Sequence, residues 1–243
     1  MDGTRTPKTR IFVEAAPGVG GAVALPDNEA RHVFKVLRAR AGDLVEVVGD
    51  GGRLLLAEVG GGREVTVIDE VEAGFEEVAI TLYQAVPKGG RMDLVIEKAT
   101  EAGATRIVPL LTEHGEVNPR EGKLDRWRRV AEAAARQSLR LRVPEVPKPV
   151  SFREALREAG STGVLLHNGP EAGDFEAAVG AGTCLFVGPE GGWGEGELAE
   201  AREASIPVAG LGPYRLRSET AGVIAVARAL AALMRRVEVE GGV

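Results

Sequence analysis

Residues 184–196 read CLFVGPEGGWGEG, a short apolar run followed by a glycine-rich loop. The apolar run lacks alternation, which is typical of a strand buried on both faces of a parallel sheet. Five glycines among the nine loop residues let the backbone turn tightly and approach a ligand closely. The loop has neither the Gly-Lys-Ser/Thr ending of a phosphate-binding loop nor the G-x-G-x-x-G spacing of a dinucleotide site. It predicts a ligand held mainly by backbone groups, with a plain glycine-rich connection as the alternative.

Similar apolar runs alternate with helical patterns on both sides of this stretch. The predicted strands are 79–85, 106–111, 164–167, 184–187 and 208–211, and the predicted helices are 93–102, 124–141, 152–158, 195–204 and 219–235. Gly103 is expected to end the first of these helices. The alternation predicts an α/β domain with a mostly parallel sheet covered on both faces. Ligands of such sheets bind at the carboxyl ends of the strands, so the loops there are the candidate site.

The N-terminal part of the chain has a different pattern. Strands are predicted at 10–13, 43–48, 54–59 and 64–68, with one short helix at 30–37. Gly49-Asp50-Gly51-Gly52 between two apolar runs predicts a hairpin. We therefore expect a small β-barrel domain over residues 1–73 and a larger α/β domain over residues 74–243.

Composition excludes several classes of protein. Cys184 is the single cysteine, so an intrachain disulfide and a multi-cysteine metal site are excluded, and its apolar surroundings predict a core thiol. His32, His114 and His167 lie far apart and form no metal-binding motif, so no metal is expected. No apolar run reaches the roughly 18 residues of a membrane span, and no secretory signal is read. The expectation is a cytoplasmic protein with no membrane partner.

Two clusters of positive charge stand out against a net charge of −6. Residues 120–142 hold eight Lys or Arg residues against three acidic ones, and a second cluster lies within residues 31–40. Each is either a solvated helix face or a nucleic-acid contact, because a local basic face is enough to hold phosphates. Trp127 and Trp193 are candidates for stacking on bases, with core packing as the alternative.

A second loop follows the predicted strand 208–211 and runs to Ala221. Ser218 is placed to cap the C-terminal helix, and Glu219 in its first turn suits the helix dipole. Arg215 and Arg217 do not suit that dipole, because a cation is disfavoured at a helix N-terminus. They indicate an anionic group that binds there.

Five segments in series carry a family resemblance. They are Arg31–Arg38 with Gly42-Asp43; Lys88–Asp93 with Glu97–Glu101 and Gly103; Ala133–Arg140 with Val143-Pro144; Gly188–Trp193; and Leu211–Ala221. Together they resemble the ribosomal RNA small subunit methyltransferase E family over nearly the whole chain. The resemblance implies an α/β fold of the SPOUT type, with a parallel sheet and a C-terminal trefoil knot, preceded by a PUA-like β-barrel. It also implies a homodimer that uses S-adenosyl-L-methionine to methylate N3 of one uridine in 16S rRNA of the small ribosomal subunit.

The resemblance also assigns residues to sites. Cofactor binding falls on Leu166, His167, Gly188, Pro189, Glu190, Gly191, Leu211, Gly212, Leu216 and Arg217. RNA binding is expected at Arg31, His32, Lys35, Arg38, Lys88, Arg91, Gln137 and Arg140, from charge and family match together. The chain departs from the family pattern at Gly90, at His114 and at Arg136. At the position of Arg136, directly before Gln137, the family usually has an acidic residue.

Arg217 and Glu219 are the catalytic candidates. N3 of uracil carries a proton at neutral pH, so methylation requires its removal or stabilisation of the anion. Arg217 is expected to stabilise the anion and Glu219 to act as base or orienting group, with helix capping as the alternative for Glu219. Two other functions stay open: a SPOUT enzyme that acts on another RNA, and a catalytically silent ribosome-assembly factor that binds RNA.

Overall fold

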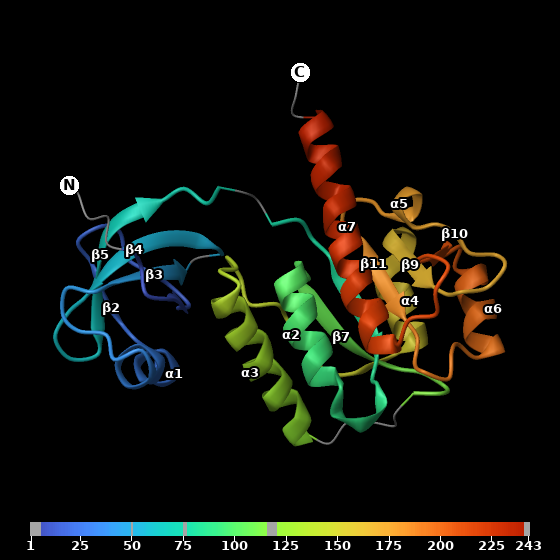
Figure 1. Cartoon of the computed structure of the whole chain (residues 1–243), viewed down its shortest axis with the longest axis horizontal. Helices are drawn as coiled ribbons and strands as arrows, with labels where there is room; N and C mark the ends of the chain where they lie inside the picture. The colour runs from blue at the N-terminus through green and yellow to red at the C-terminus, as the bar shows by residue number, and fades with distance from the viewer. Residues whose placement is uncertain (1–5, 50, 75–76, 116–120, 241–243) are drawn as a thin grey trace. The chain divides into compact units, whose positions relative to one another are not determined.

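The computed structural model describes residues 6–49, 51–74, 77–115 and 121–240, with only the backbone at 121 and 237–240. The described residues form two compact units. The first comprises Met1–Glu76 together with Ala135–Val143, and the second comprises Glu77–Ala134 together with Pro144–Val243. The chain therefore returns to the first unit for one short segment before it completes the second (Figure 1).

The second unit is built on a seven-stranded sheet with the strand order β10-β12-β9-β11-β6-β7-β8. Its strands are β6 (Thr81–Ala85), β7 (Arg106–Leu111), β8 (Val150–Ser151), β9 (Gly163–Leu166), β10 (Gly173–Asp174), β11 (Cys184–Val187) and β12 (Val208–Gly210). Every pair of neighbouring strands is parallel. The predicted α/β fold with a parallel sheet is confirmed.

Burial explains why the apolar runs became strands. Every residue of β9 and β11 is buried, as expected for central strands covered on both faces. The Tyr83 ring of β6 stacks on the Phe186 ring of β11 with their centroids 4.8 Å apart. Cys184 is buried in the same apolar core, where its thiol was predicted.

Helices connect the strands. They are α2 (Met92–Ala102), α3 (Glu121–Gln137), α4 (Phe152–Ala159), α5 (Phe175–Ala178), α6 (Glu195–Glu203) and α7 (Ser218–Glu240), and short 3-10 turns lie at η2 (Lys88–Gly90) and η3 (Gly160–Thr162). Gly103 ends α2 with a φ of 114°, which confirms its predicted role because glycine adopts this conformation freely. None of the described helices combines the length and apolarity that crossing a membrane requires.

The first unit contains a five-stranded sheet with the order β1-β3-β4-β5-β2. The strands are β1 (Arg10–Phe12), β2 (Ala22–Ala24), β3 (Leu44–Gly49), β4 (Arg53–Val59) and β5 (Glu64–Val71). β1 runs parallel to β3, and the other pairs are antiparallel. Strands β3 and β4 form the predicted hairpin; Gly51 and Gly52 adopt positive φ, and Asp50 lies outside the described residues.

Three details of the prediction differ from the structure. The short strands β2, β8 and β10 and the four-residue helix α5 were not predicted, because two to four residues outside a longer apolar run carry no measurable periodicity. The first helix is a short α1 (Asp27–Ala30) that continues as a π-helix, η1 (Arg31–Val36). Helix α3 ends at Gln137 rather than at 141, because Leu139 turns the backbone to a φ of 55° and Leu141 packs beside Val48 and Leu54 in the first unit.

Candidate active site

A cavity of about 810 Å³ lies at the carboxyl ends of three neighbouring strands of the second unit. Its walls come from the segments that follow β9, β11 and β12. The lining residues are Leu166, His167, Asn168, Val187, Gly188, Pro189, Glu190, Gly191, Gly192, Trp193, Leu211, Pro213, Arg215, Leu216, Arg217, Ser218 and Ala221. The strand order brings these segments together, as the topology of a parallel sheet predicts.

Trp193 anchors the glycine-rich loop to the end of β9. Its indole N–H donates a hydrogen bond of 2.9 Å to the carbonyl oxygen of Leu166, which joins the β11 loop to the end of β9. A Cβ at Gly188 would lie 3.0 Å from the Trp193 ring, so a larger residue there would have to displace the buried ring by a few tenths of an ångström. Trp193 is buried, as is Trp127, so packing is the better explanation for both rings.

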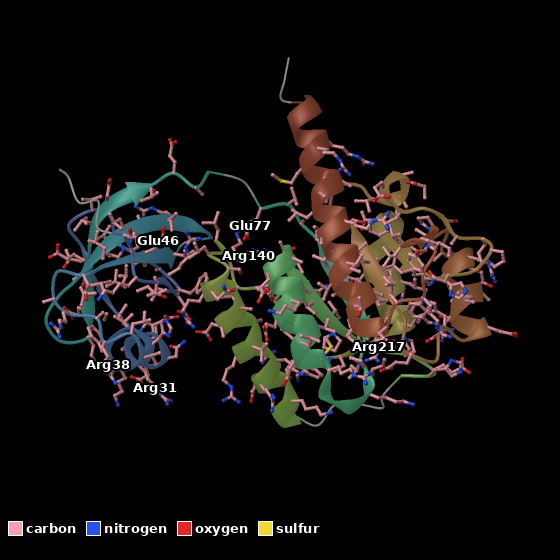
Figure 2. All side chains as sticks on the ribbon, viewed as in Figure 1. Arg31, Arg38, Glu46, Glu77, Arg140 and Arg217 are labelled. Carbon is pink, nitrogen blue, oxygen red and sulfur yellow. The ribbon has the colours of Figure 1, made fainter. Side chains whose placement is uncertain are left out.

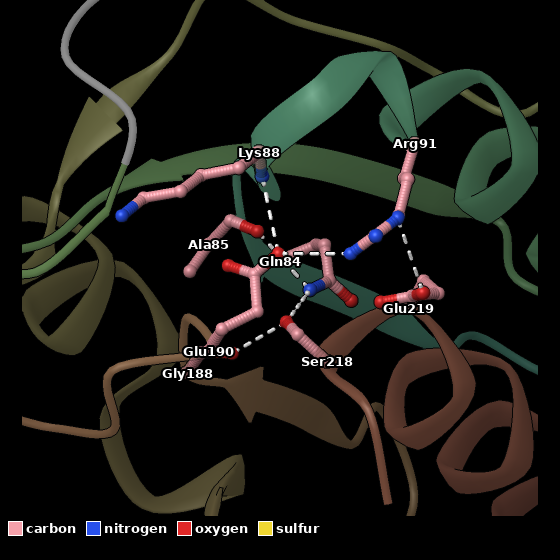
Figure 3. Close-up of polar contacts among 8 residues, drawn as sticks. All are labelled: Gln84, Ala85, Lys88, Arg91, Gly188, Glu190, Ser218 and Glu219. Atoms are coloured by element: carbon pink, nitrogen blue, oxygen red, sulfur yellow. Dashed lines mark hydrogen bonds and ion pairs between the residues drawn. The ribbon is translucent and has the colours of Figure 1, made fainter.

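Ser218 links this loop to the second loop (Figure 3). Its hydroxyl donates to the carbonyl oxygen of Gly188 at 2.6 Å and accepts from Nε2 of Gln84 at 2.9 Å. Helix α7 begins at Ser218 itself, and the carbonyl of Arg217 accepts its first backbone bond from Ala221. The prediction that Ser218 caps the helix is therefore wrong: its hydroxyl is engaged between the two loops.

Arg91 connects two carboxylates near the cavity (Figure 3). Its guanidinium lies 3.4 Å from Oε1 of Glu190 and 3.5 Å from Oε1 of Glu219. The backbone N–H of Lys88 also donates to Oε1 of Glu190. The segment after β6 thus contacts the glycine-rich loop through Glu190 and the first turn of α7 through Glu219.

Glu219 has one engaged and one available oxygen. The residue is 7% exposed, and Oε2 accepts no hydrogen bond from any described residue. A buried carboxylate oxygen with no donor is unfavourable unless a ligand supplies one. Glu219 is not among the residues that line the cavity, so a ligand reaches this oxygen only if the side chain or its neighbours shift.

The cations of the second loop pair with no carboxylate of the described residues. Arg215 and Arg217 are exposed side chains that line the cavity, and neither forms an ion pair with a described residue. They give the cavity a positive rim, suited to a ligand that is anionic or becomes anionic.

The predicted cofactor residues lie together, with one exception. Gly212 lines a separate cavity of about 500 Å³ beside the first, and the other nine line the main cavity. The main cavity has the size of a small-molecule site, and its loops offer backbone groups rather than a phosphate-binding lysine. These features fit S-adenosylmethionine, which carries no phosphate.

The predicted RNA residues occupy different environments. In the first unit, Arg31, Lys35 and Arg38 are exposed, and Figure 2 shows Arg31 and Arg38 at its margin near α1. His32 is half-buried, with Nε2 3.2 Å from the Thr9 hydroxyl. Gln137 is exposed, whereas Arg140 is 6% exposed, so an RNA contact would require its side chain to move outward.

In the second unit, Lys88 and Arg91 are exposed. Arg91 is already paired with two carboxylates, so its charge is partly compensated. His114, one of the departures from the family pattern, lies against the glycine-rich loop with Nδ1 3.2 Å from the Gly192 carbonyl oxygen. The described residues contain no group of three or more side chains arranged to bind a metal ion.

Several site residues were missed from the sequence. Asn168, Pro213 and Ser218 line the cavity, and Gln84 donates a hydrogen bond to Ser218. The sequence offered one signal for Gln84, which is the single amide in the apolar run of β6. The structure shows that this amide is fully buried.

Comparison with known proteins decides the family. A model of an RNA methyltransferase domain matches residues 75–230. A ribosomal RNA small subunit methyltransferase E from Mycobacterium bovis is 34% identical over 89% of this chain and 88% of its own length. The chain belongs to the ribosomal RNA small subunit methyltransferase E family.

Solved structures agree with membership of the methyltransferase E family. A family member from Neisseria gonorrhoeae, bound to S-adenosylmethionine, is 32% identical with a TM-score of 0.83 and covers 93% of this chain and 98% of its own. A Legionella pneumophila protein described as a methyltransferase, also solved with that cofactor, is 27% identical with a TM-score of 0.82. That match covers 92% of this chain and 97% of the other.

Proposed function

We propose that this protein transfers the methyl group of S-adenosylmethionine to N3 of a specific uridine in 16S rRNA of the small ribosomal subunit. The observation that carries the proposal is the cavity at the carboxyl ends of β9, β11 and β12, which unites the cofactor motif with Arg217. The names of the relatives support an rRNA substrate, and two structural neighbours were solved with the cofactor.

The loops of the cavity would hold the cofactor mainly through their backbone. Gly188 and Gly191 lie on the β11 side, and Leu211 and Leu216 lie on the β12 side. When bound, S-adenosylmethionine supplies an activated methyl group on a positively charged sulfur. The protein therefore needs to position the uracil and stabilise its anion more than to activate the methyl.

Glu219 and Arg217 have different roles toward the uracil: Glu219 accepts a proton, and Arg217 stabilises negative charge. After a shift of its buried side chain toward the cavity, the Oε2 of Glu219, which has no hydrogen-bond partner among the described residues, accepts the proton of N3. The guanidinium of Arg217 stabilises the negative charge that spreads onto the uracil carbonyl oxygens. N3 would then bond to the methyl carbon as the bond between that carbon and the cofactor sulfur breaks, which leaves neutral S-adenosylhomocysteine. The proton stays on Glu219 until solvent removes it.

The family supports further proposals about architecture. The first unit acts as a PUA-like RNA-binding domain, with Arg31, Lys35 and Arg38 on its exposed surface. The C-terminal segment forms the trefoil knot of SPOUT enzymes, and two copies of the chain form the active dimer. Such a domain recognises the shape and backbone of RNA rather than a duplex groove.

Methyl transfer from labelled S-adenosylmethionine to small ribosomal subunits that lack the modification tests the function, with nucleoside analysis of the product. Labelled 3-methyluridine is the expected result. Label in another nucleoside would overturn the substrate and favour a SPOUT enzyme with another target. Cofactor binding without transfer to any RNA would favour the assembly factor.

A further inference from the structure

Tyr214 is the feature of the second loop that the proposed function leaves unexplained. Its side chain is 80% exposed, the largest value among the exposed large hydrophobic residues of the described chain. Tyr83, the other tyrosine, is fully buried and stacked on Phe186. The fold therefore uses one tyrosine in its core and presents the other to solvent.

The backbone of Tyr214 is held while its ring is free. Nδ2 of Asn168 donates a hydrogen bond of 3.4 Å to the Tyr214 carbonyl oxygen. The ring stacks on no described aromatic side chain, and no described cation lies over it. An exposed ring that packs on no described aromatic side chain is an arrangement suited to a partner outside the chain.

The neighbours of Tyr214 indicate which partner fits. Pro213 and Arg215 line the cavity on either side of it in the sequence, and Arg217 follows two residues later. Arg215 and Arg217 are exposed and form no ion pair with a described residue. An exposed aromatic ring in the same short loop as two exposed guanidinium groups is a combination that suits single-stranded nucleic acid, because bases stack on the ring and phosphates pair with the cations.

We infer that Tyr214 is a stacking platform for an unpaired base of the RNA beside the methylated uridine. The inference rests on the proposed function and extends it to substrate recognition. A uridine that reaches the cofactor must leave its own stack, so a neighbouring base loses a partner. The exposed Tyr214 ring, on a residue between two that line the cavity, replaces that partner.

Substitution of the ring tests the inference. Tyr214→Ala is expected to raise KM for unmethylated small subunits by about 5- to 150-fold, the range that loss of one base–aromatic stack produces. Tyr214→Phe should stay within about twofold of the wild type, because the ring rather than the hydroxyl stacks. The Kd for S-adenosylmethionine should not change in either variant. Leu94→Ala removes another exposed apolar side chain, from α2, and serves as the matched control.

A second readout separates this inference from the proposed function. Fluorescence anisotropy with a short labelled oligouridylate measures RNA binding whether or not methyl transfer occurs. Weaker binding by Tyr214→Ala in an enzyme that transfers no methyl would support the platform and overturn the function. Normal methyl transfer and binding by Tyr214→Ala would overturn the platform alone.

Two further outcomes also count against the platform. If Tyr214→Phe is as impaired as Tyr214→Ala, the hydroxyl rather than the ring is required. If Tyr214→Ala changes the sedimentation coefficient to that of a smaller assembly, the ring contacts a second copy of the chain.

Discussion

The hydroxyl of Ser218 donates a hydrogen bond of 2.6 Å to the carbonyl oxygen of Gly188. The same hydroxyl accepts a bond from the fully buried amide of Gln84, so β6, the glycine-rich loop and the start of α7 meet at one oxygen atom. The two loops of the cavity are thereby fixed relative to each other before any ligand arrives. Such preorganisation lowers the ordering cost of binding.

Ser218→Ala should weaken cofactor binding roughly tenfold, because it leaves the buried amide of Gln84 and the partly buried carbonyl of Gly188 without their partner. Isothermal titration with S-adenosylmethionine measures the Kd. Ser151→Ala is the control, since Ser151 caps α4 with its own side chain. That control should lower the melting temperature and leave the Kd unchanged. An unaltered Kd in Ser218→Ala would show that the bond is structural only.

Arg91→Ala should lower kcat by about tenfold or more, because Glu219 loses the cation that orients its carboxylate. Steady-state kinetics with varied rRNA substrate separates kcat from KM. Arg153→Ala breaks an exposed pair with Glu200 in the same unit and should leave both constants unchanged. A rise in the RNA KM with constant kcat would instead assign Arg91 to RNA binding, as the sequence predicted.

Arg136→Ala should destabilise the first unit by about 3–5 kcal/mol, because it removes a cation from a buried ion pair. Nη2 of Arg136 lies 2.6 Å from Oε1 of Glu29, whose side chain is 1% exposed. Urea unfolding gives the free energy. Arg126→Ala is the control, since its pair with Asp93 is solvent-exposed and should contribute less than about 1 kcal/mol. Equal losses in the two variants would contradict the importance of burial.

Gly103→Ala should destabilise the second unit by about 2 kcal/mol, because alanine is strained at a φ of 114°. An added Cβ would also lie 2.8 Å from Cδ2 of Leu230 on α7. Thermal unfolding of Gly103→Ala alone, Leu230→Ala alone and the double variant separates the two causes. If the double variant loses no more than Leu230→Ala, steric contact rather than backbone strain is responsible.

The sequence predicted the parts of the fold that depend on local pattern. Strands β7 and β11 match their predicted ranges because each is a buried apolar run. The residues expected to bind the cofactor, apart from Gly212, line one cavity because they follow strands that the topology places side by side. Their contacts with the cofactor stay a prediction.

The sequence did not predict contacts between distant segments. Ser218 had a local explanation as a helix cap, and its actual partners, Gly188 and Gln84, lie 30 and 134 residues away. Arg91 was assigned to RNA from charge and family match, because no pattern indicated that Glu190 and Glu219 lie beside it. Pairing across such separations depends on the tertiary fold rather than on periodicity.

The segment 135–143 belongs to the first unit although it is encoded within the second. Arg10 donates hydrogen bonds to the carbonyl oxygens of Leu139 and Arg140, and Leu141 covers Val48 and Leu54. During translation, the first unit therefore cannot complete its core until residue 143 has left the ribosomal exit tunnel. A fragment that stops at residue 76 would expose Val48 and Leu54 and leave Arg10 without these two acceptors, so the first unit is not separable by simple truncation.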